Sequence, residues 1–268
     1  MEAVKERLAN GYSRAALHYD ALAGQMYVAG IRRLLPRATV PPKAAILDVG
    51  CGTGVNLLEA ARWFAPTRLL CGIDISPGMA AVARRKAAAL GIPVEITVGD
   101  AERLPYPDNA FDLVLCNSVL HWFKDRRRAL KEMHRVLRPG GQLLLLGAAA
   151  PAFQEWFALL DGLMHAATGS RPQSTIPPLP TAAEIATNMM AAGFLLEHFQ
   201  NPVHRQHVTE AEPFVRLMAT VAPTWTADLS PEAQLALEGL AAQTMRLGWP
   251  GGFPNTWAAV EAVGRKLV

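Results

Sequence analysis

Short apolar segments alternate with segments of helical composition between residues 45 and 150. The apolar segments are bounded by small or polar residues, which is typical of buried strands in a parallel sheet. The predicted strands are residues 46–49, 69–76, 94–101, 111–117 and 142–146. The segments of helical composition between them are residues 55–61, 77–90 and 124–137. This alternation predicts an α/β fold with a doubly wound, mostly parallel sheet.

The rest of the chain adds helices and two further strands. Thr181 and Glu184 have the spacing of a capping box, which marks the start of a helix. The other predicted helices are residues 1–35, as one or two helices, 151–171 and 181–192, and the added strands are 193–199 and 203–208. The sheet is therefore predicted to have seven strands. The remainder is predicted to be helical around a Gly/Pro interruption at residues 248–254.

These elements divide the chain into three parts. Residues 1–40 are predicted to form N-terminal lid helices, and residues 41–150 a ligand-binding core. Residues 151–268 are predicted to contain a helical cap inserted after the fifth strand, the last strands and C-terminal helices. Since ligands of such folds bind at the carboxyl ends of the strands, the lid and the cap are the segments that would roof the site.

A glycine-rich loop joins the first strand to the next helix. It begins after Asp48 and reads Gly50-Cys51-Gly52-Thr53-Gly54. Because glycine has no side chain, a ligand can approach the backbone at the start of the helix. The third glycine comes one residue earlier than in the dinucleotide fingerprint G-x-G-x-x-G. The loop therefore favours a less anionic ligand, such as one with an amino-acid tail.

Two carboxylates follow the next strands. Asp74 ends the second strand, where a carboxylate can accept hydrogen bonds from both hydroxyls of a ribose. Asp100 ends the third strand, followed by Ala101, in a place suited to the exocyclic amine of adenine. A nicotinamide enzyme is the alternative for such a sheet.

Charge and hydropathy narrow the class of protein. The chain has 268 residues and a net charge of +3, which is too small to imply binding to nucleic acid. The longest apolar run, residues 143–150, is too short to span a membrane, and no signal segment follows the N-terminus. Basic clusters at residues 84–86 and 126–128 indicate either solvated helix faces or a docking patch for an acidic partner.

Three cysteines, Cys51, Cys71 and Cys116, lie in or beside predicted buried elements. They are interpreted as small apolar residues in a reducing compartment, so we expect a cytoplasmic protein. A metal or arsenical site is the alternative, but no C-x-x-C spacing supports it, and no metal is predicted.

Five motifs in order resemble those of class I S-adenosylmethionine-dependent methyltransferases, in the group often called type 11. They are residues 47–54, 72–76, 99–105, 111–112 and 130–141. The resemblance implies a Rossmann-like methyltransferase fold, S-adenosyl-L-methionine as cofactor and S-adenosyl-L-homocysteine as product. The cofactor-binding residues that it implies are Tyr12, Asp48, Gly50, Cys51, Gly52, Gly54, Asp74, Ile75, Met79, Asp100, Ala101 and Asn117.

Looser matches extend beyond the core. Residues 12–20, 117–123 and 252–257 are similar to segments of the malonyl-acyl-carrier-protein methyltransferases of biotin synthesis. The first two are also similar to those of quinone-biosynthesis methyltransferases. The resemblance implies carboxyl O-methylation of a malonyl-carrier-type acid, or C- or O-methylation of a quinone-like or natural-product ring. A non-catalytic protein that binds the cofactor is a further alternative.

Methyl transfer from a sulfonium is an in-line displacement, which needs alignment and, for some acceptors, a base. His121 follows the fourth strand and is the candidate base, with a structural role as the alternative. Tyr12 and Tyr19 are seven residues apart, so we expect them on one face of a lid helix that closes over the methionine end of the cofactor. Tyr19 is the second candidate catalytic residue, and ordinary packing in the lid is the alternative. Aromatic residues that could line an acceptor pocket are Trp225, Trp249, Phe253 and Trp257.

The expected partner is a small-molecule or acyl-carrier-bound substrate, with no nucleic acid and no membrane. A monomer and a dimer both fit the sequence.

Overall fold

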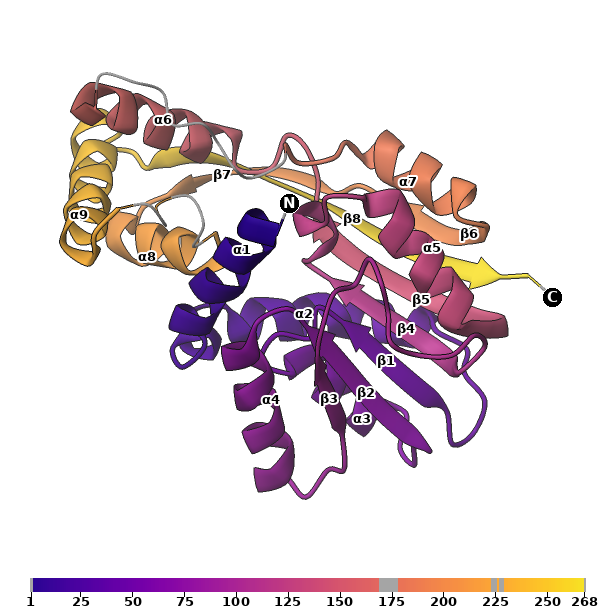
Figure 1. The fold of residues 1–268 in the computed structure, drawn as a ribbon. Coiled ribbons are helices and arrows are strands. Elements are labelled where there is room, and N and C mark those ends of the chain that lie inside the picture. Colours follow the sequence, from indigo (N-terminus) through magenta and orange to yellow (C-terminus); the bar gives the residue numbers. More distant parts are fainter. Residues whose placement is uncertain (1, 169–177, 223–225, 227–228, 268) are drawn as a thin grey trace.

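The computed structural model describes residues 2–168, 178–222, 226 and 229–267. Its sheet has eight strands in the order β3-β2-β1-β4-β5-β8-β6, and β7 pairs with β8 (Figure 1). Strands β1 to β5 are parallel, whereas β8 is antiparallel to β5, β6 and β7. The predicted doubly wound, mostly parallel sheet is confirmed. The strands are β1 (Ala45–Val49), β2 (Leu69–Asp74), β3 (Glu95–Val98), β4 (Phe111–Asn117), β5 (Leu137–Ala148), β6 (Phe194–Gln200), β7 (Val203–Val208) and β8 (Phe253–Lys266).

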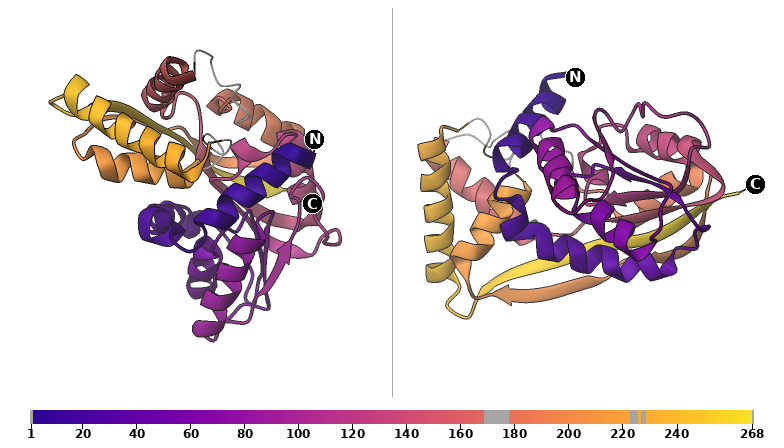
Figure 2. Two further views of the ribbon diagram at one scale, coloured as in Figure 1. Left: turned by 60° about the vertical axis from the view of Figure 1, so that its left-hand side comes forward. Right: turned by 90° about the horizontal axis from the view of Figure 1, so that it is seen from below.

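Helices cover both faces of this sheet (Figures 1 and 2). On one face, apolar side chains of α2 and α3 pack on Ile46 and Leu144. On the other face, Met133 of α5 and Met189 of α7 pack on β4 and β5. The helices of this part are α1 (Glu2–Ala15), η1 (Asp20–Gly24), α2 (Gln25–Leu34), η2 (Leu35–Arg37), α3 (Val55–Trp63), α4 (Pro77–Ala89), η3 (Leu120–Trp122), α5 (Arg126–Val136) and α7 (Ala182–Ala191).

Side-chain caps fix the first turns of several helices. The predicted capping box is confirmed: the Thr181 hydroxyl accepts from the Glu184 amide, and the Glu184 carboxylate accepts from the Thr181 amide. Ser76 caps α4 by accepting from the amide of Met79. Such caps satisfy amides that have no partner within the helix.

The prediction that the C-terminal remainder is helical is wrong at its end. Residues Phe253–Lys266 form β8, which inserts between β5 and β6. Most of these residues are buried, so the polar–apolar alternation that marks a half-exposed strand is missing. Pairing with two neighbouring strands outweighs the local helical tendency of the alanines in this segment.

β8 also joins the sheet to a helical cap. Its first half pairs with β7 and its second half with β5 and β6, so one long strand runs through both parts (Figure 2). The cap has its own core, in which Trp156, Phe214 and Phe253 are buried. Its helices are α6 (Gln154–Thr168), α8 (Ala211–Val221) and α9 (Pro231–Gly248).

The prediction that Tyr12 and Tyr19 share one helix face is wrong, because α1 ends at Ala15. The chain turns after α1, and Tyr19 precedes the π-helical turn η1. The two rings nevertheless meet edge to face, with centroids 6.0 Å apart. The turn, rather than helical spacing, brings them together.

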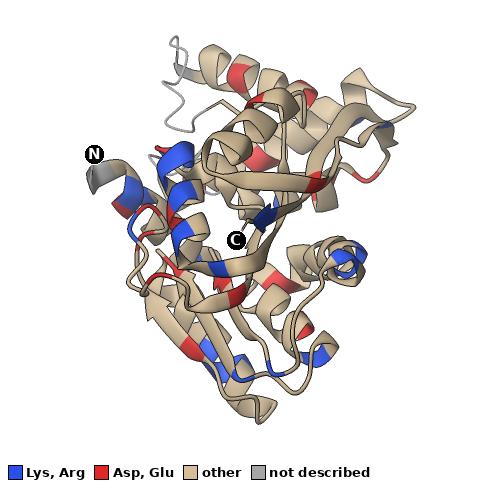
Figure 3. Ribbon diagram, turned by 90° about the vertical axis from the view of Figure 1, so that its right-hand side faces the viewer, with Lys and Arg blue, Asp and Glu red and all other residues tan. Residues whose placement is uncertain are grey.

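Basic and acidic residues are interspersed over the ribbon (Figure 3). Members of both predicted basic clusters have partners within the chain. The Lys86 ammonium lies 2.6 Å from the Asp20 carboxylate, and Arg84 donates to the Ile96 carbonyl. Arg126 donates to the Pro178 carbonyl over 2.9 Å. These contacts favour the interpretation of both basic clusters as solvated helix faces over a docking patch for an acidic partner.

The three cysteines are free and buried, as expected for small apolar residues. Among the described residues, no group of three or more His, Cys, Asp or Glu side chains is arranged to hold a metal ion. No helix in the described ranges is both long and apolar enough to cross a membrane.

Candidate active site

The glycine loop has a backbone that only glycine adopts readily. The φ angles of Gly50, Gly52 and Gly54 are +70°, +53° and +80°. A Cβ on Gly50 would also lie 2.5 Å from Cγ2 of Val119, the residue that leads into η3. The glycines therefore allow a close approach between this loop and the segment after β4.

Asp74 holds this loop in place from the neighbouring strand. Its Oδ2 accepts from the Gly52 amide and its Oδ1 from the Ser76 amide, each over 2.8 Å. Burial raises the pKa of Asp74, and these two amides oppose that effect. The carboxylate thus has a fixed orientation at the carboxyl end of β2, with further lone pairs for a ligand hydroxyl.

The loop forms one wall of a cavity of about 100 Å³, which we name the glycine-loop cavity. Most of the residues predicted to bind the cofactor line this cavity, together with Tyr19. The predicted residues found there are Tyr12, Tyr19, Gly50, Cys51, Gly52, Asp74, Ile75, Met79, Asp100, Ala101 and Asn117. The sequence motifs thus converge on one place, although they are spread over four strand ends.

Asp48 and Gly54 are not among the lining residues. The Asp48 side chain is fully enclosed, and neither carboxylate oxygen has a hydrogen-bond partner of normal geometry among the described residues. Burial, followed by the negative charge of Asp74, raises the pKa of Asp48 to about 8. Asp48 therefore lies behind the glycine loop rather than in the cavity. Gly54 packs against Ala83 of α4.

The cavity also has walls that the sequence analysis missed. The Lys5 ammonium of α1 reaches over the cavity to Asp100 at 2.6 Å and Glu102 at 3.0 Å. Tyr27 and Trp122 complete an aromatic wall with Tyr12 and Tyr19. No motif in the sequence marks Lys5 or Tyr27, because the packing of α1 and α2 on the core brings them to the site. Trp122 belongs to the segment 117–123, but that resemblance gave it no role.

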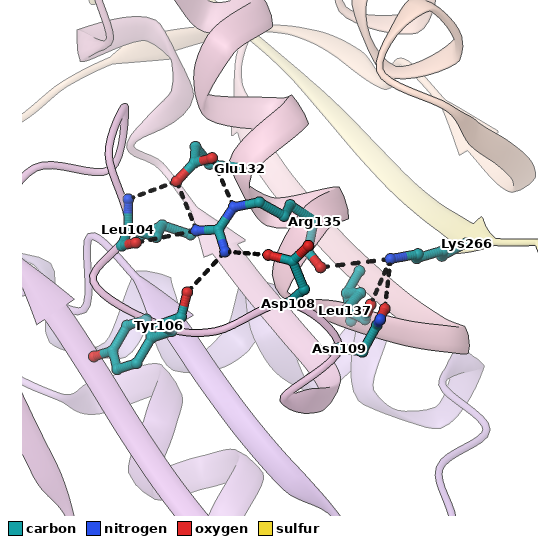
Figure 4. A network of polar contacts seen from close by, with 8 residues as sticks. All are labelled: Leu104, Tyr106, Asp108, Asn109, Glu132, Arg135, Leu137 and Lys266. Carbon is teal, nitrogen blue, oxygen red and sulfur yellow. Dashed lines mark hydrogen bonds and ion pairs between the residues drawn. The ribbon is translucent and has the colours of Figure 1, made fainter.

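The segment that carries Asp100 and Glu102 is tied to α5 by Arg135 (Figure 4). The Arg135 guanidinium pairs with Glu132 and Asp108, each at 2.8 Å, and donates to the carbonyls of Leu104 and Tyr106. A guanidinium with this many partners fixes a loop more firmly than a single ion pair. The network thereby sets the position of the acidic edge of the glycine-loop cavity.

Asn117, at the end of β4, links the two sides of the site. Its side-chain amide donates to Asn56 of α3, and its Oδ1 accepts from the Ser118 hydroxyl, both over 2.9 Å. Ser118 has a φ of +57°, an uncommon backbone conformation for a residue with a side chain. The hydrogen bonds fix both the amide and the turn that follows it.

A second cavity of about 660 Å³ lies between the end of β5, α2 and the cap, and we name it the cap cavity. Its lining is mainly apolar and includes Phe153, Phe157 and Trp257. Tyr27, Ser118 and Trp122 line both cavities. The two cavities therefore share a wall at the carboxyl ends of the central strands.

The predicted base His121 lines the cap cavity and not the glycine-loop cavity. Burial, followed by the nearby charge of Arg126, lowers the pKa of His121 to about 4. Its Nδ1 is enclosed without a hydrogen-bond partner among the described residues. At neutral pH the ring is uncharged, so it is able to accept a proton.

Of the aromatic residues predicted to line an acceptor pocket, Trp257 lines the cap cavity. Trp249 and Phe253 are not among its lining residues; they pack on each other in the cap, with ring centroids 5.0 Å apart. Trp225 lies outside the described residues.

The sequence is similar to those of known methyltransferases. The family described as "Methyltransferase domain" matches residues 47–145. A malonyl-[acyl-carrier protein] O-methyltransferase of Serratia marcescens is 38% identical over 60% of this chain and 61% of its own length. The corresponding enzyme of Geobacter sulfurreducens is 30% identical over 98% of this chain and 99% of its own length. A demethylmenaquinone methyltransferase of Thermus thermophilus is 35% identical over 62% of this chain and 81% of its own length.

The fold is similar to that of solved structures. The YcgJ protein of Bacillus subtilis superposes with a TM-score of 0.61 at 21% identity, over 90% of this chain and 99% of its own. At this level of identity the likeness concerns the fold alone.

Proposed function

Because the chain belongs to the S-adenosylmethionine-dependent methyltransferases, we propose that it methylates a largely apolar small molecule held in the cap cavity. The observation that carries this proposal is the shared wall of Tyr27, Ser118 and Trp122. A cofactor in the glycine-loop cavity would present its methyl group at that wall, and an acceptor in the cap cavity would meet it from the other side. In-line transfer needs this opposed arrangement.

The residues of the glycine-loop cavity fit the parts of S-adenosylmethionine. We assign the methionine portion to the glycine loop and Asn117, the ribose to Asp74 and the adenine to Asp100 with Ala101. The positive φ angles of the loop and the fixed carboxylate of Asp74 support this assignment. The bound cofactor supplies an electrophilic methyl group, and the aromatic wall excludes water from it.

The lining of the cap cavity favours an apolar ring as acceptor over a carboxylate. Among the described residues that line it, Arg33 is the only one with a permanent charge, and its guanidinium already pairs with the buried Glu261 at 2.8 Å. A malonyl-type carboxylate would need a cation that is free to pair with it. A cavity of about 660 Å³ is also within the range that suits ring-sized ligands.

Carboxyl O-methylation of a malonyl-carrier-type acid is the second candidate. Its support is the similarity to the Geobacter sulfurreducens enzyme along almost the whole length of both chains. For this candidate function we also propose an acyl-carrier-bound substrate and a cytoplasmic location.

Release of S-adenosylhomocysteine tests the proposal directly. The purified protein is incubated with S-adenosylmethionine and either hydroxylated naphthalenes or malonyl thioesters, and methylated products are identified by mass spectrometry. We expect turnover with the ring compounds. Turnover with malonyl thioesters alone would show that carboxyl O-methylation, the second candidate, is the function. Cofactor binding without turnover of any acceptor would favour the non-catalytic alternative.

Asp74 should dominate cofactor affinity. We expect Asp74→Ala to weaken S-adenosylmethionine binding by about 30-fold, which is about 2 kcal/mol, because charge-assisted hydrogen bonds are lost. Asp74→Asn keeps one acceptor oxygen for an amide and should lose less. Calorimetric titration measures both, with Glu210→Ala, at an exposed position just before α8, as control. An unchanged affinity in Asp74→Ala would remove Asp74 from the cofactor site.

We also propose that residues 1 to 30 act as a lid ordered by the cofactor. The glycine-loop cavity of about 100 Å³ is smaller than typical small-molecule sites and is lined by residues of α1, so we expect α1 to move outward when the cofactor enters. Lys5, Tyr12 and Ser13 hold α1 down through contacts with Asp100, the Val221 carbonyl and Ser76.

Hydrogen exchange with and without S-adenosylhomocysteine checks this prediction. The amides of α1 and α2 should exchange more slowly when the ligand is bound, whereas those of α9, far from the cavity, should not change. Equal exchange of α1 in both states would show that it is a fixed part of the fold.

A further inference from the structure

The wall shared by the two cavities carries three side chains that can donate a hydrogen bond: Tyr27, Ser118 and Trp122. The Ser118 hydroxyl already donates to the Asn117 side chain over 2.9 Å. The Trp122 indole is already hydrogen-bonded to the Tyr12 hydroxyl. The Tyr27 hydroxyl is therefore the donor of this wall that a ligand can still use.

The Tyr27 hydroxyl is paired with that of Tyr19, 2.8 Å away, and the described part of the chain gives it no other hydrogen-bond partner. Two hydroxyls carry two protons, and the bond between them uses only one. Burial raises the pKa of both phenols; the shared hydrogen bond raises the pKa of Tyr19 further and opposes the rise at Tyr27. This is the pattern expected when Tyr19 donates and Tyr27 accepts, so the proton of Tyr27 remains available.

The position of Tyr27 suits an interaction with the acceptor. Tyr27 lines both cavities, whereas Tyr19 lines only the glycine-loop cavity. The two rings are parallel, with an interplanar angle of 4° and centroids 5.8 Å apart, so stacking and the hydrogen bond together restrict the Tyr27 ring. Because its pKa is raised, Tyr27 is a neutral donor at neutral pH rather than a base. A ligand that fills the cap cavity displaces water from this donor, and a donor left unpaired then opposes binding.

The oxygen that attacks the methyl group is a poor partner for this donor. It must direct a lone pair at the methyl carbon, and a hydrogen bond to the same oxygen withdraws electron density from it. An oxygen on the adjacent ring carbon accepts the hydrogen bond without this conflict. The Tyr27 hydroxyl therefore favours an acceptor with two neighbouring oxygens over one with a single hydroxyl.

We propose that Tyr27 orients the acceptor by donating a hydrogen bond to an oxygen next to the one that is methylated, and that Tyr19 fixes Tyr27 in place. The acceptor class is then a ring with oxygens on two adjacent carbons. In the transfer, the bond from the methyl group to sulfur breaks as the bond to the attacking oxygen forms. The proton of that oxygen passes to His121, which lines the same cavity, and Tyr27 keeps its own. This inference rests on the proposed function, because it takes the cap cavity as the site of a ring acceptor.

Three naphthalenes of similar size test this inference. In 2,3-dihydroxynaphthalene the two oxygens are adjacent; 2,6-dihydroxynaphthalene, with separated oxygens, and 2-naphthol, with one, are the controls. Affinities are measured by calorimetry with saturating S-adenosylhomocysteine. We expect the 2,3-isomer to bind about fivefold more tightly than either control, because it pairs Tyr27 and still has an oxygen at the reacting position. Equal affinities for all three would overturn the proposal.

Matched variants locate the donor. Tyr27→Phe keeps the ring and removes the hydroxyl, so the preference for the 2,3-isomer should fall below about twofold, with the melting temperature close to wild type. Met26→Leu changes the cap-cavity lining beside Tyr27 but no hydrogen-bonding group, and it should keep the full preference. Tyr19→Phe leaves the donor but releases it, so we expect an intermediate preference of about two- to threefold.

The other outcomes have distinct meanings. The same preference in Tyr27→Phe as in wild type would overturn the proposal, and weaker S-adenosylhomocysteine binding with that preference unchanged would assign Tyr27 to the cofactor instead. A full preference in Tyr19→Phe would show that Tyr19 does not fix Tyr27. If none of the three naphthalenes binds, the proposed function is contradicted, and this inference with it. Absence of turnover with acceptors that bind concerns the methyl transfer alone.

Discussion

Replacement of His121 with Gln is expected to lower kcat about a hundredfold or more, with melting temperature and S-adenosylhomocysteine affinity close to wild type. His121 lines the cap cavity beside Trp122, a residue of the shared wall. Methyl transfer to a hydroxyl oxygen makes its proton strongly acidic, so even the weakly basic His121 ring can accept it. Glutamine preserves a polar side chain at this position but has no such basicity.

The pH dependence of kcat/KM adds a second readout for His121. Because the pKa of His121 is lowered to about 4, the ring stays unprotonated through neutral pH, and the rate should fall only below about pH 5. Arg126→Met removes a positive charge next to the ring and should move this fall to higher pH. His204→Gln, at an exposed position in β7, is the matched control and should leave both rate and profile unchanged.

Two other outcomes for His121→Gln have distinct meanings. A loss of less than tenfold in a folded, cofactor-binding variant would favour a carboxylate acceptor, which arrives already ionised and needs no base. Loss of melting temperature and cofactor affinity together with rate would assign His121 a structural role in the turn after β4.

The core of the fold could be predicted because local signals and the sheet agree there. β1, β2 and β4 are short, mostly apolar runs with a helix or a turn signal on either side, as is the second half of β5. β8 could not be predicted in this way. Its residues are buried by β5, β6 and β7, which lie far away in sequence, and its local pattern contains no information about that pairing.

In the candidate site, too, some residues could be predicted from local sequence signals, whereas others depend on packing between distant segments. Asp74 and the glycines were predictable because a parallel sheet brings consecutive strand ends to one edge. Lys5 and Tyr27 were not, because they reach the glycine-loop cavity only through the packing of α1 and α2 on the core. From the sequence, Asp48 was predicted to bind the cofactor and His121 to act near the methyl group, but how deeply each side chain is buried could not be predicted. Burial is the main cause of the pKa shift of each residue.

Replacement of Asp48 with Asn is expected to remove a large pH dependence of stability from the cofactor-free protein. Burial and the charge of Asp74 raise the pKa of Asp48 to about 8 in the folded state, compared with about 3.9 in an unfolded chain. The folded protein therefore holds this proton more tightly. Its contribution to stability is fully present below about pH 4 and is lost as the pH rises, by about 1.4 kcal/mol per pH unit, until the folded carboxyl ionises near pH 8.

Asparagine resembles the protonated carboxyl in shape but cannot ionise, so the variant should escape this loss. Between pH 5.5 and pH 8.5 the free energy of unfolding of Asp48→Asn should gain about 3 kcal/mol relative to wild type. Urea denaturation at both pH values measures the change, with Asp108→Asn at an exposed site as control. Parallel pH profiles for wild type and Asp48→Asn would show that Asp48 is already ionised in the folded protein. In that case an unidentified positive partner, and not the proton, must balance its charge behind the glycine loop.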